Sequence, residues 1–73
     1  MDNNYEIEIF CSKVRKLRQM SKMSKKEMAE IMGISVYILT KIESGVLPES
    51  VDVSSLLKLC ERFDVRPSSM FLE

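Results

Sequence analysis

The chain has 73 residues with eleven basic and eleven acidic side chains, so its formal net charge is zero. This length predicts one small domain with a modest core, and the apolar content of 45% is too high for a disordered tail. No apolar run is long enough to span a membrane, and the acidic first ten residues do not look like a signal peptide. We therefore expect a cytoplasmic protein with no membrane partner.

The sequence contains two cysteines, Cys11 and Cys60, and no histidine. This set cannot build an ordinary four-ligand zinc site within one chain. Both cysteines fall on the apolar faces of expected helices, so we interpret them as buried, reduced thiols, with a redox switch as the alternative. The sequence also lacks a glycine-rich phosphate loop and a nucleophile elbow. We therefore predict no enzyme activity, no cofactor and no metal site.

Apolar residues recur every three or four positions over residues 5–20, which predicts a first amphipathic helix. Residues 1–12 carry three acidic side chains. They either belong to the start of this helix or form a separate acidic N-terminal extension, and we place the main domain at residues 13–73. The expected apolar face consists of Ile7, Phe10, Cys11, Val14 and Leu17, followed by Ser21.

Two short helices follow, separated by two or three residues that include a glycine. Ser24 and Glu27 have the spacing of a capping box, in which each side chain pairs with the other residue's free backbone N–H. Gly33 ends that helix, and Ser35 caps the next one, expected over residues 36–44. This spacing is typical of a helix-turn-helix unit, whose second helix can project into a major groove of DNA. The expected buried faces carry Met28, Ile31 and Met32 on the first helix and Leu39 and Ile42 on the second.

The remaining sequence predicts a loop and two more helices. The loop covers residues 45–52, opens with Gly45 at a left-handed exit position and contains Pro48. Pro67 suits the first turn of a final short helix, because its missing N–H would be unpaired there in any case. Five short helices without a strand give an all-α domain. The apolar face of the fourth helix is expected to carry Val53, Leu56, Leu57, Cys60 and Phe63.

The charges are distributed unevenly along the chain. Residues 13–28 carry seven basic side chains and one acidic one, whereas the segments before and after this block are net acidic. A charge run of this kind is usually a solvated helix face. It is also the charge pattern expected of a surface that binds a partner rich in phosphate.

Taken together, these segments resemble the phage-repressor/Cro-type (XRE) helix-turn-helix family. The resemblance rests on "VRKLR", "MSKKEMAEIMGIS", "LTKIESG" and "LLKLCERFDVRPSSMF", which stand in the family's order across residues 13–71. It implies a five-helix, lambda-repressor-like DNA-binding domain with a helix-turn-helix. It also implies that the core of the motif consists of Met28, Ala29, Ile34, Leu39 and Ile42.

The resemblance also implies roles in DNA binding. The helix over residues 36–44 would be the recognition helix, and Lys25 takes the place at which family members commonly hold a phosphate. Arg18 and Glu43 match a pair that forms a structural salt bridge between the first helix and the recognition helix. The implied base-reading residues are Val36, Tyr37, Thr40 and Lys41, and the implied phosphate contacts are Lys22, Ser24, Lys25, Lys26 and Ser44.

Two departures from the family pattern keep a second hypothesis open. The loop after the recognition helix carries Val46 and Leu47 where family members commonly place a basic residue on a phosphate. The recognition helix also lacks the Gln, Asn and Arg side chains that make bidentate bonds to purines. We predict a sequence-specific double-stranded DNA-binding transcriptional regulator. The alternative is a protein-interaction module or antitoxin-like partner that keeps the fold without strong DNA binding.

The end of the chain suggests self-association. Met70, Phe71 and Leu72 are contiguous and apolar, and a domain this small cannot easily cover all three side chains. Exposed apolar clusters usually mark an interface, and similar proteins make their two-fold contact through the last helix. We therefore predict a homodimer through the C-terminal helix, which would place two recognition helices about one DNA turn (roughly 34 Å) apart.

Overall fold

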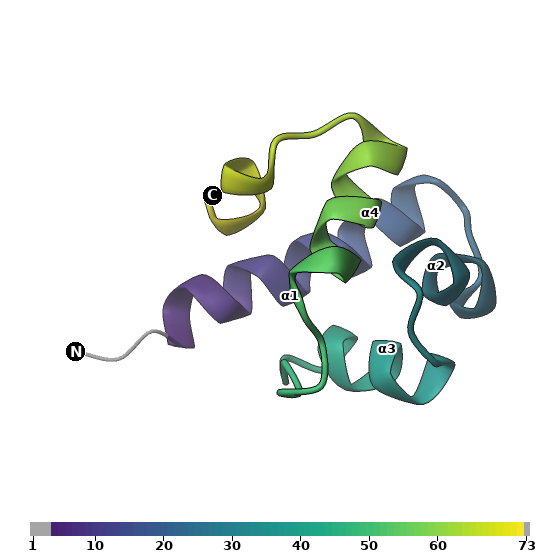
Figure 1. The fold of residues 1–73 in the computed structure, drawn as a ribbon, viewed down its shortest axis with the longest axis horizontal. Helices are drawn as coiled ribbons and strands as arrows, with labels where there is room; N and C mark the ends of the chain where they lie inside the picture. Colours follow the sequence, from purple (N-terminus) through teal and green to yellow (C-terminus); the bar gives the residue numbers. More distant parts are fainter. Residues whose placement is uncertain (1–3, 73) are drawn as a thin grey trace.

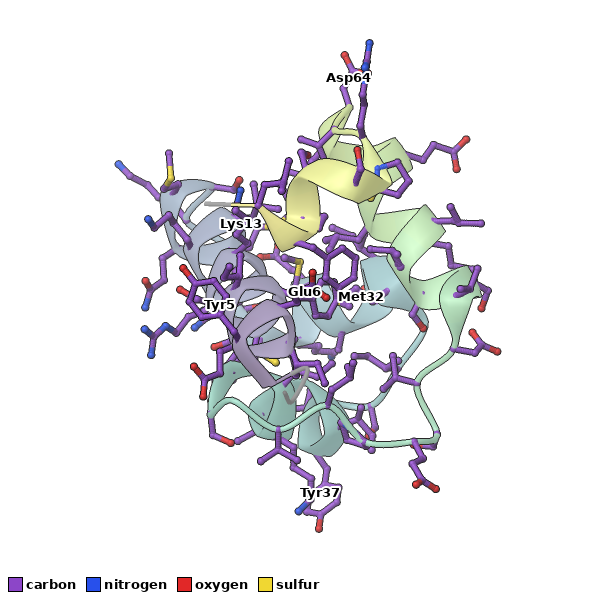
Figure 2. The ribbon with its side chains drawn as sticks, turned by 90° about the vertical axis from the view of Figure 1, so that its left-hand side faces the viewer. Tyr5, Glu6, Lys13, Met32, Tyr37 and Asp64 are labelled. Carbon is purple, nitrogen blue, oxygen red and sulfur yellow. The ribbon has the colours of Figure 1, made fainter. Side chains whose placement is uncertain are left out.

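The computed structural model describes residues 4–72, which form four α-helices and one 3₁₀-helix and contain no strand (Figure 1). The α-helices are α1 (Asn4–Met20), α2 (Lys25–Met32), α3 (Val36–Glu43) and α4 (Val53–Phe63), and the 3₁₀-helix is η1 (Pro67–Phe71). α1 packs against α3 and η1, and α2 packs against α3 and α4. Tyr37 on α3 and Asp64, which follows α4, therefore lie at opposite ends of the molecule (Figure 2). The all-α class is confirmed.

α1 is continuous from Asn4, so residues 4–12 belong to this helix within the part of the chain that the structure describes. The first three residues of the predicted N-terminal extension lie outside the described residues. The inner face of α1 matches the predicted pattern, because Phe10, Cys11 and Val14 are buried.

Short-range signals fix the ends of α2 and α3. The capping box is complete: the Ser24 hydroxyl accepts the Glu27 N–H at 3.1 Å, and the Glu27 carboxylate accepts the Ser24 N–H at 2.9 Å. Gly33 ends α2 with a φ of 72°, in the left-handed region where a side chain is costly. Ser35 caps α3 by accepting the Ile38 N–H at 3.1 Å. The two helices therefore have the short connection of a helix-turn-helix unit.

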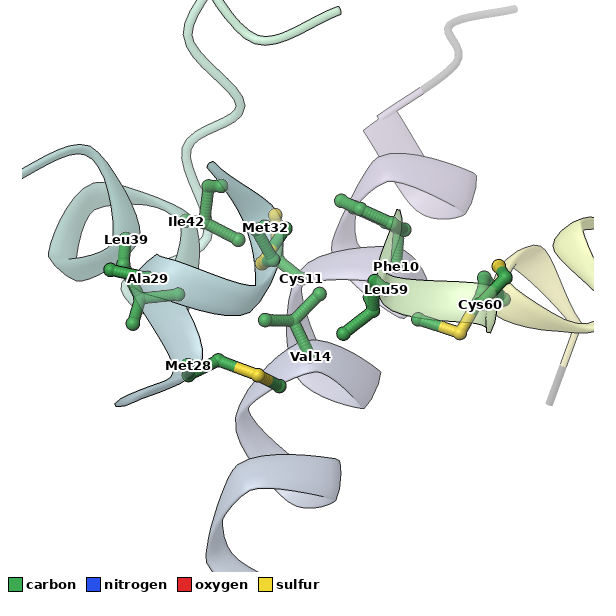
Figure 3. Close-up of a cluster of buried hydrophobic side chains, with 11 residues drawn as sticks. Phe10, Cys11, Val14, Met28, Ala29, Met32, Leu39, Ile42, Leu59 and Cys60 are labelled. Carbon is green, nitrogen blue, oxygen red and sulfur yellow. The ribbon is translucent and has the colours of Figure 1, made fainter. Parts of the chain in front are cut away.

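The hydrophobic core lies between the four α-helices and is closed by η1 (Figure 3). Both cysteines belong to it as free, buried thiols, which matches their sequence-based interpretation. Burial raises the pKa of both thiols, and the negative charge of Glu8 adds to the increase at Cys11. The core side chains are Phe10, Cys11, Val14, Met28, Ala29, Met32, Leu39, Ile42, Leu59, Cys60 and Met70.

The buried face of α4 differs from the predicted one. Val53 and Leu57 are 66% and 50% exposed, whereas Leu59 is fully buried and Ser55 is 5% exposed. The apolar residues of α4 lie on one broad side of the helix, and its inward face is rotated toward the edge of that side that carries Leu59. The packing of α4 against α2 and η1 selects the face that carries Leu59.

The predicted fifth α-helix is instead the 3₁₀-helix η1. Pro67 stands at its start, as expected, but the Ser69 N–H bonds back to the Arg66 carbonyl at 3.0 Å, which is the i to i+3 pattern. A segment of five residues is too short to gain much from α-helical hydrogen bonds.

The structure wholly or partly covers two of the three C-terminal apolar residues that were predicted to form a dimer interface. Met70 is only 2% exposed, and the Phe71 ring stacks on the Phe10 ring with centroids 5.3 Å apart. η1 folds back onto α1, so this small domain uses both side chains to close its own core. Leu72 alone of the three is largely exposed, at 63%.

Candidate nucleic-acid interface

α3 presents the four predicted base-reading residues on its outer side. Its inner side is anchored by Leu39 and Ile42, which are fully buried. Residues at spacings of one, four and five lie on one broad arc of a helix, so the predicted set faces away from the core together. In this set Val36 is 42% exposed, Tyr37 is 68% exposed, Thr40 is exposed and Lys41 is half-buried.

Lys41 is the only basic residue of α3, and its ammonium group lies over the Tyr37 ring. The Nζ atom is 5.1 Å from the ring centroid, which is a cation–π distance. The two residues are four positions apart, the spacing at which helix side chains meet. Tyr37 and Lys41 are therefore packed together on the outer side of α3.

A shallow, open depression of about 270 Å³ lies beside this face, between α1, α2 and α3. Lys25 spans it from the first turn of α2, and its Nζ lies 3.5 Å from the Thr40 hydroxyl of α3. Basic side chains outnumber acidic ones here by three to one. The depression is lined by Arg15, Arg18, Lys25, Thr40, Glu43 and Ser44.

Arg18 and Glu43 form a two-pronged ion pair that joins α1 to α3. The Arg18 Nε donates to one Glu43 oxygen at 2.6 Å and Nη2 donates to the other at 2.9 Å, while Nη1 donates to the Met23 carbonyl at 3.0 Å. The two side chains are only 15% and 6% exposed. The hydrogen bond to Glu43 raises the pKa of Arg18 above its usual value. Because Arg18 is committed to Glu43, Arg15 and Lys25 are the cations of the depression best placed for a phosphate.

The other predicted phosphate residues differ in their surroundings. Ser44 lines the depression, but its hydroxyl donates to the Lys41 carbonyl at 2.7 Å. The Ser24 hydroxyl is occupied by the capping box. Lys22 and Lys26 are exposed near the start of α2, outside the depression.

Arg15 lines the depression but was not among the predicted phosphate contacts. Its signal was its position three residues before Arg18, which places both side chains on neighbouring parts of the α1 surface.

A family model described as a helix-turn-helix domain matches residues 12–72, which is most of the chain. The chain belongs to the XRE-type helix-turn-helix family. This membership points to a DNA-binding regulator with DNA as its partner, and it makes α2 and α3 the two helices of the motif. No curated protein matches the sequence.

None of the helices within residues 4–72 has the length and apolar character needed to cross a membrane. The same residues contain no group of three or more side chains suited to hold a metal ion.

Proposed function

We propose that this protein is a sequence-specific double-stranded DNA-binding transcriptional regulator that reads the major groove with α3. The observation that carries the proposal is the position of the basic depression directly beside the exposed face of α3. A phosphate backbone bound at the depression would set the register of the protein on DNA, and base edges would then be read by α3. Both roles fall on one end of the molecule.

The proposed phosphate site centres on Lys25 and Arg15. Lys25 stands in the first turn of α2, where free backbone N–H groups and the helix dipole also favour an anion. Its contact with Thr40 places this cation at the border between the two helices of the motif. A phosphate bound there would touch α1, α2 and α3 together, which fixes the angle at which α3 approaches the bases.

The proposed base contacts follow from side-chain chemistry. Val36 offers an apolar surface to a thymine methyl group, and the Tyr37 hydroxyl can hydrogen-bond a base edge or a phosphate. Lys41 can donate to the acceptors of guanine once it leaves the Tyr37 ring. These contacts would distinguish only a few base pairs in each half-site. One copy of α3 would therefore give modest sequence selectivity.

The first experiment is selection of bound fragments from a genomic library with the purified protein, followed by titrations of the best site at several salt concentrations. Lys25→Ala should weaken binding about equally on all sequences and lower the salt slope by about one unit. Tyr37→Ala and Lys41→Ala should instead narrow the affinity gap between the best site and random DNA. Arg66→Ala, at an exposed position just before η1 and outside the basic depression, is the control for loss of one positive charge.

The opposite pattern contradicts the assignment. If Lys25→Ala abolished selectivity while Tyr37→Ala and Lys41→Ala left it intact, α3 would not be the reading helix.

A second candidate function is a protein-interaction module, as in an antitoxin-like partner. The observation in its favour is the apolar character of this end of the molecule: Val46 in the loop after α3 is 52% exposed, and the single cation of α3 is stacked on Tyr37. Failure to enrich any DNA sequence at about 50 mM salt, where phosphate contacts are strong, would favour this function.

A homodimer completes the proposed function, because two copies of α3 on a palindrome double the number of base contacts. Of the C-terminal residues predicted for the interface, Leu72 has the exposed surface to meet a second copy. The proposal uses no cofactor, and a cytoplasmic location is the setting it predicts.

A further inference from the structure

A shallow groove of about 250 Å³ lies between the second half of α1 and η1, and we call it the α1–η1 groove. Leu17 and Met20 of α1 line one side of it. Val65, in the link between α4 and η1, and Met70 of η1 line the other side. The groove is therefore built where the end of the chain folds back onto α1.

The groove presents apolar surface to solvent. Met20 is 74% exposed, more than any other large apolar residue that the structure describes, and Leu17 and Val65 are half-buried. Methionine is flexible and adapts to apolar partners of different shape. A site that encloses a small molecule usually has about 300–1,000 Å³, whereas this groove is smaller and open. It fits an apolar side chain that projects from a larger partner.

The charged side chains that line the groove are all positive. They are Lys13 and Lys16, and no acidic side chain lines it. The Lys13 Nζ donates to the Ser69 carbonyl at 2.8 Å, which holds this ammonium group at the border of η1 and uses one of its three N–H bonds. Lys16 is exposed and takes part in no ion pair within residues 4–72.

The sequence around the groove does not reverse this charge. Asp64 is the only acidic residue within two positions of a lining residue, and Arg66 offsets it on the other side of Val65. Lys22, two positions after Met20, adds a further positive charge. A complementary partner therefore combines an apolar side chain with carboxylates.

We propose that the α1–η1 groove docks a segment of another protein that carries a large apolar side chain with acidic residues within four positions of it. The apolar side chain packs between Met20 and Val65, and the carboxylates pair with Lys13 and Lys16. These two lysines are three positions apart, roughly 4.5 Å along the axis of α1, so carboxylates on neighbouring turns of a helical segment can reach both.

The position of the groove allows this docking while α3 is bound to DNA. The groove shares no lining residue with the basic depression and includes none of the predicted DNA contacts. Lys13 lies towards η1, well apart from Tyr37 at the lower end of the molecule (Figure 2). The protein would thus hold a partner at its DNA site. That consequence rests on the proposed function, whereas the docking itself does not.

The test is selection from a displayed library of random short peptides with the purified full chain, at about 150 mM salt to screen weak surface attraction. The enriched peptides should share an apolar residue with Asp or Glu within four positions. In titrations of the best peptide, replacing its apolar residue by Ala should weaken binding roughly ten-fold. Lys16→Glu and Met20→Glu should each weaken binding by a similar factor, because each places a carboxylate beside the acidic peptide.

The matched controls are Lys58→Glu and Val53→Glu, which make the same two changes at exposed positions of α4 outside the groove and should bind like the parent. The absence of an apolar–acidic pattern among selected peptides overturns the proposal, as does a peptide that binds Met20→Glu as tightly as the parent. A peptide that is lost in Lys25→Ala but kept in Met20→Glu occupies the basic depression, which also overturns it.

Two further measurements separate this proposal from others. In sedimentation equilibrium without peptide, a dimer that is lost in Met20→Glu would assign the groove to a second copy of the chain and overturn the proposal. The selected peptide should leave the affinity for the best DNA site unchanged, and displacement of DNA by the peptide would contradict the placement of the docking site. A protein that binds the peptide through the groove but binds no DNA would overturn the proposed function alone.

Discussion

The ion pair between Arg18 and Glu43 gives the sharpest test of how this domain is held together. Glu43→Ala removes both hydrogen bonds from the guanidinium group of Arg18 and leaves it with the Met23 carbonyl as its partner. Arg18 is then a mostly covered positive charge with little to balance it. The change does not add bulk, so its effect reports the missing contact and not a steric clash.

The expected cost lies between two limits. Exposed ion pairs contribute about 0–1 kcal/mol, whereas breaking a buried pair costs about 3–5 kcal/mol. Glu43 is 6% exposed and Arg18 15%, which is close to the buried limit, but Arg18 keeps one acceptor and an edge open to water. We expect Glu43→Ala to lower the free energy of unfolding by about 2–3 kcal/mol. At about 4–8 °C per kcal/mol for a domain of this size, the Tm should fall by roughly 10–20 °C.

The assay is thermal unfolding followed by circular dichroism, with Glu30→Ala as the control for an exposed helical glutamate. The double variant Arg18→Met, Glu43→Leu should recover much of the loss, because an unpaired buried charge costs more than the absence of both charges. A Tm for Glu43→Ala within about 2 °C of the parent value would refute the buried-pair reasoning. The explanation by an unpaired charge would be refuted if the double variant lost more free energy of unfolding than Arg18→Met and Glu43→Leu lose together as single variants.

Three further predictions concern local features of the fold. Gly33→Ala should lower the Tm by roughly 4–8 °C in thermal unfolding, because a φ of 72° costs a side chain about 1 kcal/mol. The hydrogen bond from the Ser54 hydroxyl lowers the pKa of Asp52 below its ordinary value of 3.8. The ionised Asp52 carboxylate therefore stabilises the fold fully above that ordinary pKa, and this stabilisation is lost as the pH falls through the lower pKa of the folded state. The Tm of Asp52→Asn should therefore decline less than that of the parent between pH 4 and about pH 2. Cys11 and Cys60 should react with a maleimide only as fast as the domain unfolds, because both thiols are buried and have raised pKa values. The rate of maleimide labelling at rising denaturant concentrations measures this.

The ends of α2 and α3 were predictable from the sequence because each depends on contacts within a few residues. The capping box joins Ser24 to a residue three positions away, and Gly33 needs only its own φ angle to end α2. The inward face of α4 was not predictable in the same way. Its apolar residues share one broad side of the helix, but the part of that side that turns inward depends on packing against α2 and η1, which periodicity does not describe.

The candidate interface was only partly predictable for a similar reason. The outward position of the base-reading residues follows from the spacing of Leu39 and Ile42, which is a property of one helix. Arg18 and Glu43 are 25 positions apart, and family resemblance rather than periodicity pointed to them. The covering of Met70 and Phe71 was not predictable from local spacing, because it depends on η1 folding back onto Phe10 of α1.

These contacts give α1 a role in the proposed DNA recognition although it carries none of the predicted base-reading residues. A guanidinium held by two hydrogen bonds to one carboxylate fixes orientation as well as distance, which a lysine at the position of Arg18 would not do. The angle of α3 is therefore set relative to α1.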